Sequence, residues 1–179
     1  MAKDSPTHIW LMRGLFAGLS ALVIMLHLLP LSTLPARWAP PDLMLAFTCA
    51  WVLRRPDYAP LILVAAVFFM ADLLLQRPPG LLAALVVIGC NYLETRAAAL
   101  KEASFIGEWL AVCLTITAIT VTNRVVLMVL AVDQAQLSLT LIQMLLTMVF
   151  YPIAAGVTHY GLRVRKLAPG DAEIAGGRA

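Results

Sequence analysis

Two charged residues lie where the sequence is otherwise apolar, and they are the first candidates for chemistry. Asp72 lies in the run AAVFFMADLLL, and a carboxylate near the middle of a bilayer costs on the order of 2.5–3.5 kcal/mol. Arg124 lies in a second apolar run. We predict an ion pair between Asp72 and Arg124 that fixes how two helices pack; contact of Asp72 with Arg77 or with interfacial water is the alternative. A proton relay is less favoured, because no second intramembrane carboxylate or histidine accompanies Asp72.

Further acidic residues lie at the starts of apolar runs. Asp42 and Asp57 each follow a proline there. An aspartate at the N-cap accepts a backbone N–H and places its charge at the positive end of the helix dipole. We therefore expect Asp42 and Asp57 to cap helices. Glu108 and Trp109 open a later run, where an acid suits the dipole and a tryptophan suits the membrane interface.

Arginine, proline and glycine mark the breaks between the apolar runs. Arg54 and Arg55 form a hinge between two of them, and Pro79 and Gly80 close the second. Pro152 lies inside the last run, and its missing N–H predicts a kink in that helix.

The sequence contains no motif of a known catalytic or metal-binding site. It lacks HExxH, GxSxG, a Walker loop and paired carboxylates on a helix. The cysteines Cys49, Cys90 and Cys113 lie in apolar runs without metal-ligand spacing, so we interpret them as small buried hydrophobes. We expect no catalytic residues, no metal and no cofactor, and therefore not an enzyme.

The composition indicates which elements must position these residues. Of 179 residues, 61% are hydrophobic and 13% are charged. Globular domains are nearer to half apolar and about a quarter charged. Apolar segments recur along nearly the whole chain, and no polar stretch is long enough for a soluble domain. We predict an all-α integral membrane protein with one domain.

Six transmembrane helices are predicted, at about 9–29, 42–53, 58–75, 81–100, 105–132 and 137–162, followed by a basic and then disordered tail at 163–179. The second is short, because its apolar run covers about 16 Å of a hydrocarbon core about 30 Å thick. Either the approach at 38–41 dips into the bilayer, or neighbouring helices shield this one. Non-helical backbone at membrane depth must be buried in protein or line a cavity, so we expect a packed six-helix bundle.

The distribution of basic residues predicts the orientation of this bundle. In a six-helix topology, ten of the 13 Lys and Arg residues fall on the side of the N-terminus: Lys3, Arg13, Arg54, Arg55, Arg96, Lys101, Arg163, Arg165, Lys166 and Arg178. Only Arg37 and Arg77 fall on the opposite side. Because cytoplasmic loops carry an excess of Lys and Arg, both termini are expected in the cytoplasm.

Four segments in order resemble one family. These are PDL at 41–43, WVLRRPDY at 51–58, ADLLLQRPPGL at 71–81 and the Tyr151-Pro152 pair. Together they resemble MreD, the rod shape-determining membrane protein, in its alphaproteobacterial form. The resemblance implies a six-helix fold similar to the substrate-binding component of energy-coupling-factor vitamin transporters. It also implies binding to MreC and work with MreB, RodZ, RodA and its transpeptidase partner in peptidoglycan synthesis.

The leading hypothesis is therefore a non-enzymatic scaffold that maintains cell shape. In that role Arg54, Arg55, Arg96 and the cluster at 163–166 either meet cytoplasmic partners or anionic lipid, or simply face water. The alternative is a small-molecule binding component of a membrane transporter, supported by the implied fold and by Asp72 and Arg124. A lipid-modifying enzyme is disfavoured, since no candidate nucleophile or metal-ligand set is present.

Overall fold

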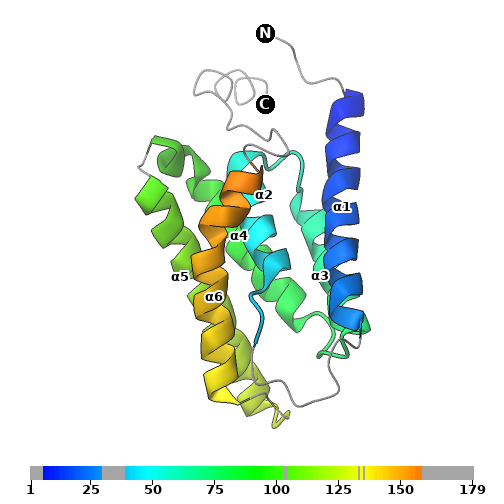
Figure 1. Ribbon diagram of the computed structural model, residues 1–179, viewed down its shortest axis with the longest axis vertical. Helices are drawn as coiled ribbons and strands as arrows, with labels where there is room; N and C mark the ends of the chain where they lie inside the picture. The colour runs from blue at the N-terminus through cyan, green and yellow to red at the C-terminus, as the bar shows by residue number, and fades with distance from the viewer. Residues whose placement is uncertain (1–5, 30–38, 103–104, 133, 135, 159–179) are drawn as a thin grey trace.

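The computed structural model describes residues 6–29, 39–102, 105–132, 134 and 136–158. These residues form six helices and no strand: α1 (Pro6–Leu28), α2 (Leu43–Arg54), α3 (Leu61–Leu74), α4 (Leu81–Glu102), α5 (Phe105–Val129) and α6 (Leu137–Gly156) (Figure 1). The predicted all-helical class is confirmed. The predicted tail at 163–179 lies outside the described residues.

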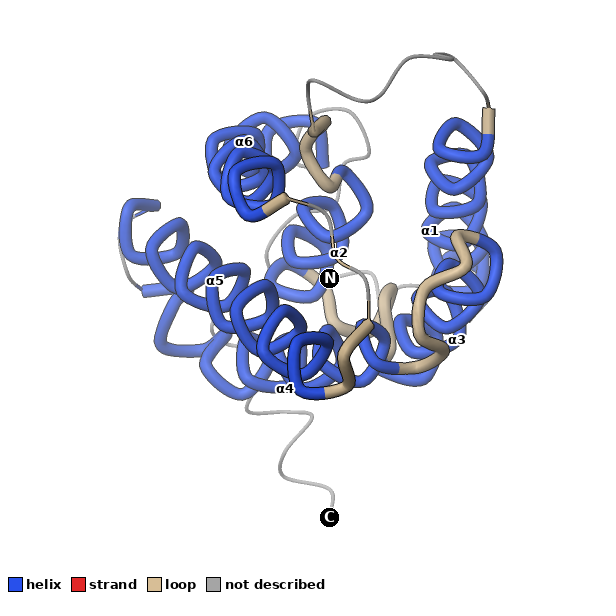
Figure 2. The backbone as a smooth tube through the Cα atoms, turned by 90° about the horizontal axis from the view of Figure 1, so that it is seen from below, coloured by secondary structure: helices blue, strands red, loops and turns tan. Residues whose placement is uncertain are grey.

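Helix α2 lies at the centre of the bundle. Ten of its 12 residues are buried, and α6, α4 and α1 pack against it. Seen along the bundle, the other helices form an arc around α2 in the order α6, α5, α4, α3, α1 (Figure 2). The sequence LMLAFTCAWVL is apolar on all sides, so no face of this helix needs contact with water and all of them can be buried. The shielding expected for this short helix is therefore present.

Helix α2 occupies only part of the depth of the bundle. We call the end that holds the start of α1 the near end, and the opposite end the far end. Figure 1 shows α2 in the near half, approached by loop from the far end. The backbone N–H of Asp42, which precedes α2, donates to Thr147 Oγ1 at 2.9 Å, and Thr147 lies near the middle of α6. The chain before α2 thus reaches mid-depth of the bundle, and neighbouring helices shield α2 itself.

In the part of the chain that the structure describes, three helices are long and apolar enough to cross a membrane: Thr7–Leu28, Phe105–Val129 and Leu137–Gly156. Helices α2 and α3 are shorter apolar helices. Large apolar side chains project from the outer faces, among them Ile62, Met128 and Val149, which are 85%, 68% and 65% exposed. Apolar surface exposed on this scale indicates contact with lipid or partner proteins. The structure therefore supports a membrane protein.

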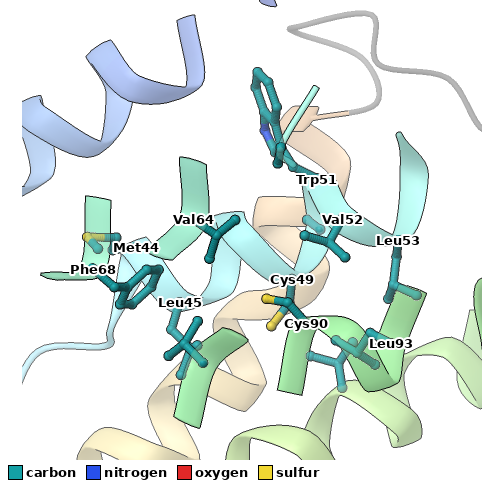
Figure 3. Close-up of a cluster of buried hydrophobic side chains, with 14 of the residues drawn as sticks. Met44, Leu45, Cys49, Trp51, Val52, Leu53, Val64, Phe68, Cys90 and Leu93 are labelled. Atoms are coloured by element: carbon teal, nitrogen blue, oxygen red, sulfur yellow. The ribbon is translucent and has the colours of Figure 1, made fainter. Parts of the chain in front are cut away.

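The core is built where α2, α3 and α4 meet. Figure 3 shows Cys49 and Leu53 of α2 beside Cys90 and Leu93 of α4. Cys49 and Cys90 are buried free cysteines, as predicted, whereas Cys113 is only half-buried. Within the described ranges, no three His, Cys, Asp or Glu side chains gather in a way that could hold a metal ion.

Helices α4 and α5 approach closely at Gly89. A Cβ atom added there would lie 2.8 Å from Thr115 Cγ2 and 2.9 Å from Ile119 Cδ1. Real Cβ atoms essentially never come that close to another heavy atom, so a larger residue would force these helices apart. The glycine therefore sets the packing distance between α4 and α5.

Most helix ends lie within two residues of the prediction, but α1 begins three residues early, at Pro6, and three other ends differ as follows. Helix α3 begins at Leu61 instead of at 58, because Pro60 disfavours helical backbone at the residue before it. Helix α5 ends at Val129, three residues before the predicted end. Helix α6 continues through Pro152 to Gly156, and residues 157–158 are π-helical; residues 159–162 of the predicted helix lie outside the described residues.

Candidate functional site

Asp72 is fully buried near the end of α3, and its carboxylate bonds the start of α4. Its Oδ2 atom accepts the backbone N–H groups of Gly80 at 3.1 Å and of Ala83 at 3.3 Å. The first N–H groups of a helix have no partner within the helix, so this carboxylate caps α4 from the preceding helix. The turn between them contains Pro79 and requires Gly80, whose φ is +84°.

The predicted ion pair between Asp72 and Arg124 is wrong. Arg124 Nη1 instead donates to Thr140 Oγ1 of α6 at 2.8 Å. Helix α4 packs between α3 and α5, so it separates the two residues and offers Asp72 closer donors (Figure 2). Asp72 therefore stabilises a local helix start, and Arg124 joins α5 to α6.

The two predicted aspartate caps have different outcomes. Asp42 Oδ1 accepts the backbone N–H of Leu45 at 3.0 Å, so Asp42 caps α2 as predicted. Asp57 does not cap α3, because Pro60 delays the helix and itself takes the N-cap position. Asp57 lies exposed in the preceding turn, where its backbone carbonyl accepts Arg13 Nε at 2.9 Å.

Three buried polar side chains meet at the near end, and we call them the near-end network. Glu108 of α5 is 1% exposed, and its Oε1 atom accepts the Tyr151 hydroxyl of α6 at 2.7 Å. The same oxygen lies 3.5 Å from Arg54 Nη1 of α2, which is also buried. The network therefore connects three helices through one carboxylate. Arg55 lies outside it, with its guanidinium carbon 5.4 Å from the ring centre of Tyr58.

A second contact between α5 and α6 lies beside this network. Pro152 has no N–H, so the carbonyl four residues earlier, that of Met148, loses its partner within the helix. Trp109 Nε1 donates to that carbonyl at 3.0 Å. The helix can continue through Pro152 because α5 supplies the missing donor. Glu108 lies in the first turn of α5, as expected for the dipole, and in addition Glu108 and Trp109 hold α6 through Tyr151 and Met148.

A cavity of about 330 Å³ lies in the far half, where α2 is absent; we call it the far-end cavity. Asp42 and Leu45, at the start of α2, line it together with α5, α6 and the turn between α3 and α4. Its polar lining residues are Asp42, Gln76, Arg77, Thr120, Asn123, Arg124, Gln134, Thr140, Gln143 and Thr147. Its volume is at the lower end of the range of about 300–1,000 Å³ for small-molecule sites.

Two residues near this cavity have left-handed backbone. Gln76 has a φ of +55° after α3, and Ala131 has a φ of +52° after α5. In each case the following residue bonds back to the helix: Arg77 N–H to Asp72 O at 2.9 Å, and Val132 N–H to Leu127 O at 3.1 Å. This is the Schellman helix end, which normally uses glycine at the left-handed position.

Known proteins add nothing to this geometry. No family model, curated protein or solved structure matches the chain. Function must therefore be argued from the two polar regions and from the sequence segments that resemble MreD.

The two regions differ in what they can do chemically. In the near-end network, Glu108 is enclosed by Arg54 and Tyr151, so it joins helices and offers no open position for a substrate. The far-end cavity has two guanidinium groups, amides and hydroxyls around open space, so it can bind a polar ligand. The sequence offered one signal for the near-end network: an acid, Glu108, at the start of one apolar run, and an arginine, Arg54, at the end of another.

Proposed function

We propose that this chain is a non-enzymatic membrane scaffold of the MreD type. In this proposal it crosses the bacterial inner membrane six times with both termini in the cytoplasm. It binds MreC and helps MreB, RodZ, RodA and its transpeptidase partner to organise peptidoglycan synthesis and maintain rod shape. The proposed fold resembles the substrate-binding component of energy-coupling-factor transporters.

The observation that carries the proposal is the position of the resembling segments. The block at 41–81 supplies the central helix α2, the turn after it, α3 and the start of α4. The outer helices surround this block with exposed apolar side chains, such as Leu114 at 62% and Val129 at 76%. A small bundle of this kind presents helix faces to lipid and to other membrane proteins.

The alternation of the helices and the charges support six crossings. Arg13 lies in the first half of α1, Arg54 and Arg55 at the end of α2, and Arg96 in the last part of α4; Arg77 lies between α3 and α4, and Arg124 near the end of α5. The first four thus belong to elements that reach the near end, and the last two to elements that reach the far end (Figure 1). An excess of basic residues at the near end favours a cytoplasmic location for that end. A reporter fused to the C-terminus should therefore report cytoplasm; a periplasmic signal would contradict the six-span topology.

The decisive experiment is a pull-down of the tagged chain from detergent-solubilised membranes. We expect MreC and the wall synthases to co-purify, and an unrelated six-helix membrane protein with the same tag to recover neither. Depletion of the chain should also turn rods into round cells. Normal rods, with MreC absent from the pull-down, would refute the scaffold role.

The far-end cavity supports one alternative: a small-molecule binding component of a membrane transporter. Ten of the described residues around the cavity are polar, and a small-molecule site requires convergent polar groups of this kind. Recovery of an ATPase pair with a transmembrane coupling subunit, in place of MreC, would favour this alternative.

A further inference from the structure

The far-end cavity exists because α2 is short. Helix α2 begins beside Thr147, near the middle of α6, so its column is empty of helix from there to the far end. Helix α5 continues past this point toward the far end and stops at Val129, and α6 begins at the far end with Leu137. Their polar side chains consequently face space that no described helix fills. Polar residues at this depth are expensive unless they are paired or functional.

The charges around the cavity favour an anion. Arg77 and Arg124 contribute two positive charges from different walls, the turn after α3 and helix α5. Asp42 contributes one negative charge, which already accepts the Leu45 N–H at the start of α2. Among the described residues that line the cavity, positive charges therefore exceed negative charges by one; the carboxylate of Asp42 caps α2, and Arg124 also donates to Thr140.

The kind of donor narrows the class of anion. A guanidinium presents a planar set of N–H groups that matches phosphate oxygens, and Arg is the residue of choice for phosphate recognition. The amides of Asn123 and Gln143 and the hydroxyl of Thr120 add donors beside the arginines. The lining also contains apolar residues, with Leu82, Ile116, Ile119 and Met144 among them. Such a cavity suits a phosphate group attached to a small or partly apolar body.

We propose that the far-end cavity binds the phosphate group of a ligand, with Arg77 and Arg124 as its charged contacts. Two sources share this chemistry: the headgroup of an anionic lipid that enters from the bilayer, and a water-soluble phosphate compound. The proposal does not rest on the scaffold function, because it concerns the far end whatever partners bind the outer faces.

The test measures thermal unfolding of the purified full-length chain in neutral detergent. In one arm inorganic phosphate is titrated against chloride at equal ionic strength, which removes general screening effects. In the other arm mixed micelles contain phosphatidylglycerol or, as the zwitterionic reference, phosphatidylcholine. Arg77→Gln and Arg124→Gln each remove one charged contact. Arg96→Gln is the matched control, because Arg96 is exposed near the other end of the bundle, 5.1 Å from the ring centre of Tyr92.

We expect phosphate or phosphatidylglycerol to raise the unfolding temperature, and each cavity variant to weaken the apparent affinity at least about tenfold. The Arg96→Gln variant should bind like the original chain. Stabilisation by inorganic phosphate assigns a soluble source, and stabilisation by phosphatidylglycerol alone assigns a lipid source.

Two results would overturn the proposal. One is the absence of any stabilisation beyond that given by chloride and phosphatidylcholine. The other is unchanged binding in Arg77→Gln, which is exposed at the turn and is expected to fold even if Arg124→Gln does not. Neither result affects the pull-down of MreC, so failure of this inference is distinguishable from failure of the scaffold function.

Discussion

The two halves of the bundle use arginine in opposite ways. In the near half, Arg54 is buried against Glu108, and the same carboxylate accepts the Tyr151 hydroxyl. In the far half, Arg77 and Arg124 line an open cavity. The difference follows from the length of α2, which begins at mid-depth and fills only the near half. Where the central helix is present, an arginine is buried between helices; where it is absent, two arginines line a cavity, and one of them, Arg124, also bonds Thr140.

This comparison predicts that replacing the buried polar residues of the near-end network costs the most stability. Removing one partner of a buried ion pair leaves the other charge without compensation, which typically costs about 3–5 kcal/mol. Glu108→Ala leaves Arg54 buried and removes the acceptor of Tyr151. We therefore expect a loss of about 3–5 kcal/mol in the free energy of unfolding, measured by chemical denaturation in detergent.

The matched control removes both charges. Replacing a buried pair by apolar residues of similar volume is often close to neutral, so Arg54→Met with Glu108→Leu should be more stable than Glu108→Ala alone. A double variant as unstable as the single one would show that the carboxylate contributes through Tyr151 and not through Arg54.

At the far end, Asp72→Ala should have the next largest effect. The change removes two hydrogen bonds from a carboxylate to the start of α4, and loss of a cap or of a charged hydrogen bond costs about 1–3 kcal/mol. We expect a loss of about 2 kcal/mol. Because Asp72 does not contact Arg124, the effect should add to that of Arg124→Ala within about 0.5 kcal/mol. Partial rescue in the double variant would contradict this and indicate an ion pair between Asp72 and Arg124.

The fate of Asp72 illustrates what the sequence could predict. The number of helices and most of their ends follow from local signals, since prolines, glycines and charges separate the apolar runs. The cap by Asp42 is equally local, because its partner is three residues away. The partner of Asp72 depends on which helices are neighbours, and apolar periodicity does not specify the order of helices around α2. The ion pair with Arg124 failed for that reason.

The near-end network and the cavity depend on the same missing information. Glu108 was expected to interact with its own helix dipole, because the sequence does not reveal that Arg54 and Tyr151 lie beside it. The length of its apolar run predicted that the second helix is short, but it did not predict the cavity between the start of this helix and the far end. That space depends on α5 and α6 extending past the start of α2, which is a tertiary relation.

A smaller effect is expected for the tryptophan beside the near-end network. Trp109→Phe removes the donor to the Met148 carbonyl while keeping an aromatic ring. A buried acceptor left without a partner costs about 1–3 kcal/mol, and the neighbouring bonds remain, so we expect about 1–2 kcal/mol. Pro152→Ala returns the helical N–H to Met148. In the Pro152→Ala background, Trp109→Phe should cost clearly less. Equal costs in both backgrounds would show that the contribution of the Trp109 indole does not depend on the N–H that Pro152 lacks.

The smallest effect should be a gain at the rim of the far-end cavity. Gln76 has a φ of +55°, a left-handed conformation that costs a residue with a Cβ atom roughly 1–2 kcal/mol, whereas glycine adopts it readily. Glycine also loses more entropy on folding, so Gln76→Gly should raise the free energy of unfolding by only about 0.5–1 kcal/mol. Because Gln76 lines the cavity, the same variant tests whether its side chain binds the ligand. Increased stability with unchanged phosphate affinity would restrict recognition to Arg77 and Arg124. A loss of affinity despite the gain in stability would mean that the strained turn holds the amide in place for binding.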